Sequence, residues 1–175
     1  MKIYTRKGDN GMTGLRDGKR VSKSSKEIEV LGSVDELVAN LGLCKALCLE
    51  GSIDEARRDF LVKTIEDLQK LLMKVMAVVA GRGRDTGVVK EEDLKHIEGI
   101  IDKVLEVLPP LNQFVVPGAN QLEASMHVAR TVCRRAERRA VSLKGLDPLV
   151  LALLNRTSDL LFVLARLAGC KGNEK

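Results

Sequence analysis

The sequence is poor in aromatic residues and contains no tryptophan. Aromatic residues make up 2% of its 175 positions, with one tyrosine and three phenylalanines. Surfaces that bind single-stranded nucleic acids stack bases on aromatic side chains, and β-sheets concentrate aromatic and β-branched residues. The shortage therefore argues against a nucleic-acid partner and against a sheet-rich fold.

The chain also lacks a CxxC pair, a leader-like segment and an apolar run of about 18 residues, so we expect no membrane partner. Its four cysteines are widely spaced, although Cys44 and Cys48 share one helical face with Leu41. This is the usual setting of buried thiols. We interpret all four cysteines as reduced core residues of a cytoplasmic protein.

Apolar residues make up 45% of the chain, enough for residues 1–175 to form a single domain with its own core. The net charge of +5, with both signs interspersed, suits an anionic ligand such as a nucleotide. Apolar residues recur every three to four positions in five stretches. These stretches predict an all-α five-helix bundle, with helices over 26–49, 53–80, 91–108, 120–143 and 148–170.

The stretch from Met126 to Ala140 is exceptionally rich in arginine, with five arginines and one acid. Arg130, Arg134 and Glu137 fall at i, i+4 and i+7, on the shoulder of its apolar face. Charge held there needs a partner, which is either an ion pair within the helix or a ligand. The remaining arginines fall on the far side, where we expect solvent: Arg135, Arg138 and Arg139.

The last predicted helix is apolar nearly all round and carries one narrow polar strip. Asn155, Asp159 and Arg166 form this strip, with Phe162 beside them. Buried polar groups need partners, so we expect the strip to face the shoulder of the arginine-rich helix. Arg156 falls on an apolar face without an evident partner in the chain, and a subunit contact would explain it.

Residues 1–25 differ from the rest, because they are rich in glycine, hydroxyl and basic residues with little periodicity. Glycines let backbone N–H groups approach phosphate oxygens, and Lys7 and Lys23 supply positive charge. The segment contains no GxxxxGK[ST] sequence. It is predicted to be either a phosphate-binding loop or a disordered tail, with an extended piece at Lys2–Thr5.

Several shorter features each leave two interpretations open. Gly81–Val89 is a connector or a basic loop over a ligand. Asp35 is a solvated acid or meets a partner near small residues, and Phe114 belongs to the core or lines a pocket. Glu123 and His127 have an i, i+4 spacing found among metal ligands, but no further ligands match it.

Four blocks, in this order and spacing, resemble the PduO-type ATP:cob(I)alamin adenosyltransferases over essentially the whole chain. The match departs from the usual family pattern at Val38 and Ala119. The blocks are TRKGDNGMT at Thr5–Thr13 with Lys23 following, GSVDELVANLG at Gly32–Gly42, FVVPGANQLEASMHVARTVCRRAER at Phe114–Arg138, and LNRTSDLLFVLAR at Leu154–Arg166.

The resemblance implies a ferritin-like, cobalamin adenosyltransferase-like bundle that forms a homotrimer with active sites between subunits. It implies that ATP lies between the arginine-rich helix of one subunit and the N-terminal loop of its neighbour. The matching loop residues are Thr5, Arg6, Lys7, Gly8, Thr13, Gly14 and Lys23. The residues matching those that hold triphosphate, ribose and base are Arg134, Glu137, Arg138 and Asn155.

The resemblance further implies that Asp35 and Arg130 form an intersubunit salt bridge and that Phe114 helps displace the lower ligand of the corrinoid. With Arg134, these residues are the expected catalytic set. The implied reaction is attack of cob(I)alamin on C5′ of ATP, which gives adenosylcobalamin and triphosphate. Mg²⁺ would be bound mainly through ATP, near Glu137, with no metal site made by side chains alone.

The implied partners are other copies of the chain, a corrinoid reductase and an enzyme that uses adenosylcobalamin. An alternative is a sensor or delivery protein that binds ATP or adenosylcobalamin without turnover. A third class, a purely structural helical protein, would leave the N-terminal glycines unexplained.

Overall fold

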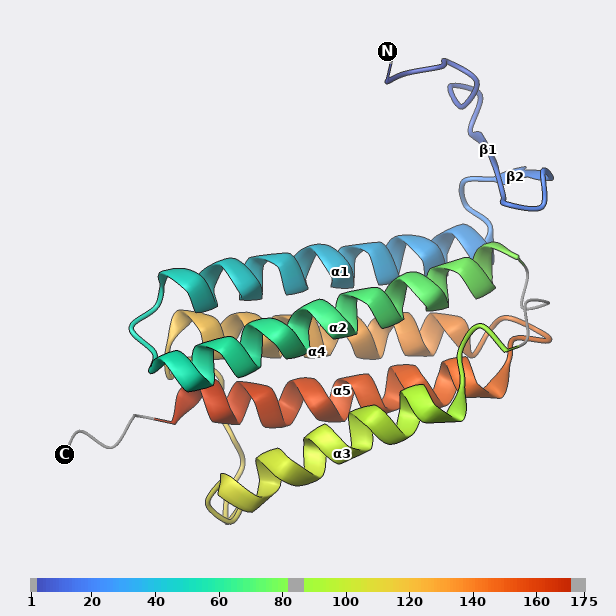
Figure 1. The fold of residues 1–175 in the computed structure, drawn as a ribbon. Helices are drawn as coiled ribbons and strands as arrows, with labels where there is room; N and C mark the ends of the chain where they lie inside the picture. Colours follow the sequence, from blue (N-terminus) through green and yellow to red (C-terminus); the bar gives the residue numbers. More distant parts are fainter. Residues whose placement is uncertain (1–2, 82–86, 171–175) are drawn as a thin grey trace.

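The protein is a bundle of five helices preceded by a small β-hairpin (Figure 1). The computed structural model describes residues 3–81 and 87–170. The predicted all-α five-helix fold is confirmed, and each helix boundary lies within three residues of its predicted place. The helices are α1 (Lys26–Glu50), α2 (Glu55–Ala80), α3 (Glu91–Val107), α4 (Gln121–Ala140) and α5 (Pro148–Gly169).

The helices begin at the capping residues that the sequence favours. Asp54 accepts a hydrogen bond from the backbone N–H of Arg57 at 2.9 Å, and Asn120 accepts one from Glu123 at the same distance. Such caps satisfy N–H groups that have no partner within the helix. Of the predicted basic loop Gly81–Val89, residues 82–86 lie outside the described residues.

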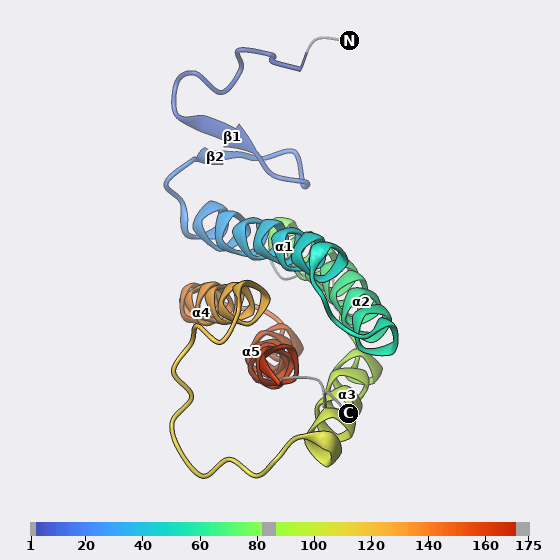
Figure 2. The ribbon, with the colours of Figure 1, turned by 90° about the vertical axis from the view of Figure 1, so that its left-hand side faces the viewer.

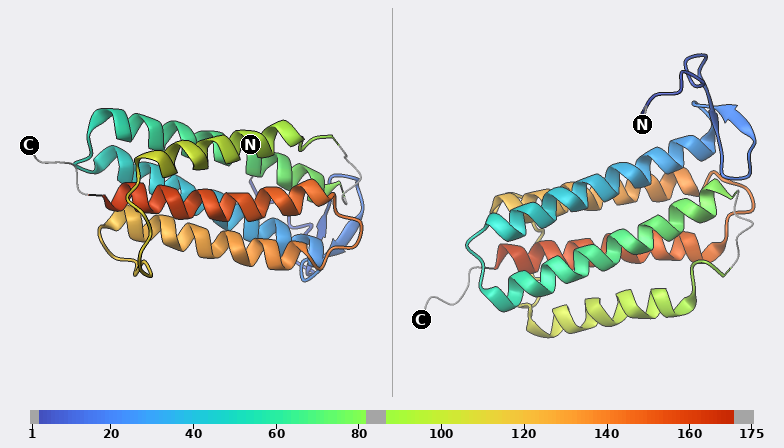
Figure 3. Two further views of the ribbon diagram at one scale, coloured as in Figure 1. Left: turned by 90° about the horizontal axis from the view of Figure 1, so that it is seen from below. Right: turned by 45° about the horizontal axis from the view of Figure 1, so that its top comes forward.

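Helix α5 forms the centre of the bundle. It packs against α4 on one side and α3 on the other, while α1 packs against α4 and α2. Viewed from the end, α1, α2 and α3 form an arc around α5, and α4 lies beside α1 (Figure 2). Because α5 is surrounded in this way, it needs apolar side chains on nearly every face. The two further views show the same arrangement (Figure 3).

One helix of the described residues, α5, is long and apolar enough to span a membrane by length and composition alone. Its burial in the bundle explains this composition. Leu153, Leu154, Leu161 and Leu164 have no exposed surface. A core helix and a membrane span pass the same test, so the composition of α5 is weak evidence for a membrane protein.

The N-terminal segment contains two short strands, β1 (Met12–Gly14) and β2 (Arg20–Ser22), which pair antiparallel. The described residues 3–5 of the predicted extended piece at Lys2–Thr5 are in no strand. The extended structure lies later because the turn at Gly18, with φ of +79°, brings the strands together. Leu15 closes this turn and is only 7% exposed.

A row of ion pairs joins α4 to α1. Arg135 pairs with Glu36, and Arg139 pairs with Glu29 and donates to the hydroxyl of Ser33. The expectation that Arg135 and Arg139 face only solvent is therefore wrong, because a second helix lies along that side of α4. These partly exposed pairs contribute little stability each, but they are specific to one alignment of the two helices.

Arg156 has partners within its own chain. Its Nε lies 2.8 Å from Glu98 on α3, and its Nη1 lies 3.7 Å from Asp159. The expectation that Arg156 has no partner in its own chain is wrong, and no subunit contact is needed to explain it. Helix α3 brings Glu98 against α5 from 58 positions away, and the spacing of residues along α5 gives no signal of this pairing.

All four cysteines are free, as predicted, and Cys44, Cys48 and Cys133 are buried. Cys170 is only partly buried and packs against the edge of the core, so the prediction that it is a core residue was only partly right. Burial raises the pKa of Cys44 to about 12, that of Cys48 to about 11 and that of Cys133 to about 12. These three thiols therefore stay protonated at neutral pH.

The neighbouring residues Leu72 and Met73 on α2 test how the core contributes to stability. Leu72 is fully buried and Met73 is 58% exposed. We expect Leu72→Ala to lower the free energy of unfolding by about 2–5 kcal/mol, because it removes buried surface and leaves a cavity. Met73→Ala should change it by no more than about 0.5 kcal/mol. Urea unfolding at one fixed protein concentration measures both, and equal losses would contradict this assignment of the core.

Candidate functional site

A groove of about 680 Å³ lies where α3, α4 and α5 meet. Its lining includes residues from both predicted polar strips, namely Arg130 and Arg134 from α4 and Asp159 and Arg166 from α5, with Phe162 beside them. The two strips therefore border one open space, although Asn155 and Glu137 are not part of its lining. With Arg156, Glu98 and Asp102, which also line the groove, it contains four arginines and three acids.

Arg134 is exposed, and within the described ranges its guanidinium has no hydrogen-bond or ion-pair partner. The predicted alternative of ion pairs with Glu137 is not realised there. Arg138 instead donates to the backbone carbonyl of Arg134 at 3.1 Å. Asn155 is also exposed. An exposed guanidinium without a partner offers five N–H donors to an anion such as a phosphate.

Arg130 is held by a buried polar chain that begins at Glu123. His127 Nε2 lies 3.1 Å from Glu123 Oε1, and both residues are at most 3% exposed. The other ring nitrogen, Nδ1, accepts a hydrogen bond from Arg130 Nε at 3.2 Å. The ring of His127 meets Phe162 edge-on at 6.1 Å. The i, i+4 pair of the sequence is thus part of a polar network that reaches the groove.

Burial lowers the pKa of His127 below its ordinary value, and the Arg130 cation lowers it further, while Glu123 opposes both effects. The arrangement is consistent with a neutral ring, because Nδ1 must keep a lone pair to accept from a guanidinium. The proton of the ring then resides on Nε2, facing Glu123.

The N-terminal hairpin brings together several of the predicted phosphate-binding residues. Arg20 Nη2 donates to the carbonyl of Lys7 at 2.6 Å, and the N–H of Lys23 donates to Gly11 at 2.8 Å. A Cβ on Gly8 would lie 3.2 Å from Lys23 Nζ, so glycine lets the ammonium approach the backbone. Sequence reasoning missed Arg20, since its bond joins residues 13 positions apart.

Arg6, beside this hairpin, has a φ of +60°, the only positive φ of a non-glycine residue in the described ranges. Its guanidinium lies over the ring of Tyr4, 5.6 Å from the centroid. Non-glycine residues rarely adopt this backbone conformation, and it is found often at ligand-binding positions. Its chain neighbours Thr5 and Lys7 are exposed, and so is Gly14 in β1.

The predicted site residues fall into separate groups on one chain. The hairpin stands beyond the start of α1 (Figures 1 and 2), and none of its residues lines the arginine-lined groove. Asp35 is exposed and, in the same ranges, forms no ion pair with Arg130. Phe114 is 98% exposed, so it is not in the core of this chain.

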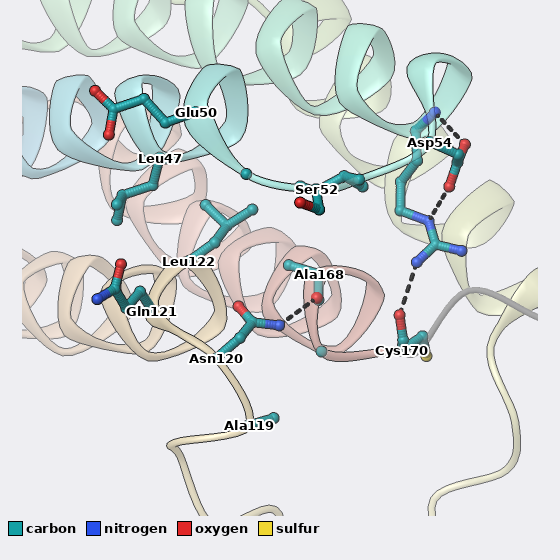
Figure 4. A pocket seen from close by; sticks show the side chains of 14 residues that line it. Leu47, Glu50, Ser52, Asp54, Ala119, Asn120, Gln121, Leu122, Ala168 and Cys170 are labelled. Atoms are coloured by element: carbon teal, nitrogen blue, oxygen red, sulfur yellow. Dashed lines mark hydrogen bonds and ion pairs between the residues drawn. The ribbon is translucent and has the colours of Figure 1, made fainter. Parts of the chain in front are cut away.

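A larger pocket of about 960 Å³ lies at the end of the bundle away from the hairpin. It is formed by the α1–α2 connection, the start of α4 and the end of α5 (Figure 4). Two of its polar side chains already have partners at the end of α5. Asn120 Nδ2 donates to Ala168 O and Arg57 Nη1 donates to Cys170 O, each at 2.8 Å. None of the predicted site residues lines this pocket, which makes the arginine-lined groove the better candidate.

Among residues 3–81 and 87–170, no group of three His, Cys, Asp or Glu side chains could hold a metal ion. The Glu123–His127 pair therefore lacks the further ligands that a protein metal site requires.

The fold and the groove define a helical-bundle protein with an arginine-lined site for an anionic ligand. Residues 3–168 match the family model described as cobalamin adenosyltransferase. The chain is 37% identical over 173 residues to the corrinoid adenosyltransferase of Citrobacter freundii, covering 95% of this chain and 94% of that protein. It is 39% identical over 176 residues to the cobalamin adenosyltransferase of Cupriavidus metallidurans, covering 98% and 90%.

The corrinoid adenosyltransferase PduO of Salmonella typhimurium is 36% identical over 173 residues. That match covers 95% of this chain but only 49% of the PduO protein.

Two solved structures of the PduO-type ATP:corrinoid adenosyltransferase from Lactobacillus reuteri share this fold. One is a Phe-to-Ala variant in complex with cobalamin and ATP, with a TM-score of 0.84, 32% identity and coverage of 96% of this chain and 93% of that one. The other is an Arg-to-Lys variant in complex with ATP, with a TM-score of 0.84, 34% identity and coverage of 95% and 94%.

The chain belongs to the cobalamin adenosyltransferase family. Its activity is the transfer of an adenosyl group from ATP to a corrinoid.

The two histidines of the chain allow a test of the buried network. Because the folded-state pKa of His127 lies below its unfolded value of about 6.5, the unfolded state takes up a proton first as the pH falls. Stability is therefore full above about pH 6.5 and declines below it, by at most about 1.4 kcal/mol per pH unit. Urea unfolding between pH 7.5 and 5.5 measures this decline.

The His127→Gln variant should lose this part of the pH dependence, whereas His96→Gln should keep it, because His96 is exposed. If both variants kept the same pH dependence, His127 would not be the group responsible.

Proposed function

We propose that the arginine-lined groove and the N-terminal loop together bind ATP and cob(I)alamin, and that the chain catalyses displacement at C5′ of ATP. Cobalt donates an electron pair to C5′, the C5′–O bond breaks, and triphosphate leaves with the bond electrons. The products are adenosylcobalamin and triphosphate. The corrinoid supplies the nucleophile, so the protein needs no Ser, Cys or His for that role.

The observation that carries this proposal is the exposed guanidinium of Arg134, which has no partner among the described residues and lies beside Arg130 at the groove. Negative charge grows on the triphosphate as it leaves, and preorganised donors stabilise that charge. We assign this role to Arg134 and Arg138. Glu137 and Asn155 are assigned to the ribose and base.

The N-terminal loop is assigned to the phosphates. The bond from Arg20 to Lys7 fixes the backbone of this loop, and Lys23 lies close to Gly8. Such a loop presents backbone N–H groups and ammonium groups to one anion. The proposed phosphate ligands are Thr5, Arg6, Lys7, Gly8, Thr13, Gly14 and Lys23.

A second copy of the chain completes the site in this proposal. The loop and the groove lie apart on one chain, and Asp35 lacks a partner among the described residues of its own chain. An Asp35–Arg130 pair between subunits of a homotrimer would bring the loop of one copy to the groove of another. Phe114, with 98% of its surface exposed, would then cover the lower face of the corrinoid and exclude water.

The two departures from the family pattern are compatible with these roles. Val38 packs partly buried against the core. Ala119 contributes its backbone N–H, which donates to Glu123. Neither side chain removes a group that we assign to phosphate binding.

Mg²⁺ enters this proposal as part of the MgATP substrate. The described side chains offer no ligand set of their own, so the ion would be held chiefly by phosphate oxygens, near Glu137. The proposed partners are further copies of this chain, a corrinoid reductase and an enzyme that uses adenosylcobalamin. The cytoplasmic location stays a prediction.

Removal of the Arg134 guanidinium tests the proposed phosphate site. We expect Arg134→Ala to lower kcat/KM by about 10²–10³-fold with the fold intact, because one transition-state donor is lost. Arg58→Ala, which removes an arginine from α2 outside the groove, is the control and should keep full activity. The visible spectrum of adenosylcobalamin and the release of triphosphate are the measurements. Full activity of the Arg134 variant would refute the assignment.

The sensor alternative predicts a different result in the same assay. A binding protein would take up ATP in calorimetry but release no triphosphate with reduced cobalamin. Triphosphate formed in equal amount to adenosylcobalamin would exclude it.

Adjacent acids on α1 test the proposed subunit interface. Asp35→Asn should weaken trimer formation or lower corrinoid turnover about tenfold, because an interface ion pair is broken. Glu36→Gln is the matched control, since Glu36 pairs with Arg135 of its own chain. Light scattering over a range of concentrations and the activity assay report both effects. A fully active Asp35→Asn trimer would remove the proposed pair.

A further inference from the structure

The side chain of Glu123 is a buried carboxylate that the proposed reaction does not use. It is 2% exposed and lies in the first turn of α4. A buried carboxylate is costly unless its oxygens are satisfied. Here each oxygen has a different partner, and the two partners lie on opposite sides of the residue.

The first oxygen, Oε2, holds the segment that leads into α4. It accepts hydrogen bonds from the N–H groups of Gly118 at 2.7 Å and Ala119 at 3.0 Å. Gly118 has a φ of +127°, which glycine adopts readily and other residues rarely do. Phe114 stands four positions before this anchor. Figure 4 shows Ala119 at the entry to α4, with Asn120 bonded to Ala168 of α5.

The second oxygen, Oε1, faces His127 Nε2 at 3.1 Å. This contact lacks the geometry of a hydrogen bond, so Nε2 has no hydrogen-bond partner among the described residues and its interaction with the carboxylate is electrostatic. Because Arg130 donates to Nδ1, the ring proton must be on Nε2. The carboxylate stabilises the tautomer that is protonated at Nε2. Only this tautomer leaves Nδ1 able to accept the hydrogen bond from Arg130.

Space for the carboxylate is built into α5. A Cβ on Gly169 would lie 3.2 Å from Glu123 Cγ, closer than most real contacts. The last turn of α5 therefore accommodates the Glu123 side chain, which keeps it turned toward the segment and the histidine.

We propose that Glu123 is a positioning residue for the corrinoid half of the site. One oxygen fixes the segment that carries Phe114, and the other fixes the His127 tautomer that holds Arg130 at the groove. This inference rests on the proposed function, in which Phe114 serves the corrinoid, and it assigns Arg130, the proposed partner of Asp35, to the same half of the site. A purely structural helix cap would affect stability alone.

The Glu123→Gln variant separates the two roles of the residue. The amide oxygen can still accept from Gly118 and Ala119, so the segment stays anchored. The amide NH₂ then faces His127 Nε2 and favours the opposite tautomer, in which Nδ1 carries the proton and no longer accepts from Arg130. We expect the KM for cob(I)alamin to rise about tenfold and the KM for ATP to stay within about twofold.

Nitrogen-15 NMR of the imidazole rings tests the tautomer without any activity. The chain has only two histidines, so a His96→Gln spectrum assigns them. The wild type should show a protonated Nε2 and an unprotonated Nδ1 for His127, and Glu123→Gln should reverse them. An unchanged tautomer, or a wild type with protonated Nδ1, would overturn the inference.

A matched destabilised variant distinguishes positioning from loss of stability. Asp54→Ala removes the cap of α2, away from the groove, and should lower Tm by roughly 3 °C without altering either KM. In a His127→Gln background, Glu123→Gln should have no further effect on the corrinoid KM. If both KM values rose together, or if Asp54→Ala gave the same change, Glu123 would be structural only.

Failure of the proposed function can be distinguished from failure of the role inferred for Glu123. A wild type that forms no adenosylcobalamin would refute the proposed function. The tautomer measurement would still support or overturn the role of Glu123 in holding Arg130.

Discussion

The packing of α4 against α5 is the constraint on which the rest of the molecule depends. Both helices give an apolar face to the core, and their polar residues are left at its edge around one groove. The charged side chains at that edge stay in contact with solvent and therefore remain ionised. The packed core beneath them limits their movement. Arg134 is therefore available to an anion, while Arg130 beside it is held by His127, and such a pair of cations suits stabilisation of a leaving group.

Sequence periodicity was sufficient for the helices because it reports burial directly. The caps Asp54 and Asn120 were also predictable, since a cap bonds within its own first turn. The arginine shoulder was recognised because Arg130 and Arg134 violate the apolar pattern at known positions. Local rules of this kind also predicted that the polar strip of the last helix would face this shoulder, and residues of both line the groove.

Contacts between distant segments were not predictable in this way. Arg135 and Arg139 were expected in solvent, but α1 lies along them. Arg156 was expected at a subunit contact, but α3 supplies Glu98. Glu123 was considered only as a metal ligand, because the sequence does not show that the backbone before α4 folds back onto its carboxylate. The first two outcomes required the order in which the helices pack, and the third required the path of the backbone at residues 118–119.

The buried thiols have a consequence for a protein that handles cobalt and an alkyl donor. Thiolates are soft ligands that favour transition metals, and they are also the reactive form toward electrophilic carbon. Cys133 lies on α4, the helix that carries the arginines, and donates to Leu154 O at 3.2 Å. With its pKa near 12, it stays a thiol at neutral pH. Cys133 is therefore kept in its less reactive form, buried beside the arginines of α4.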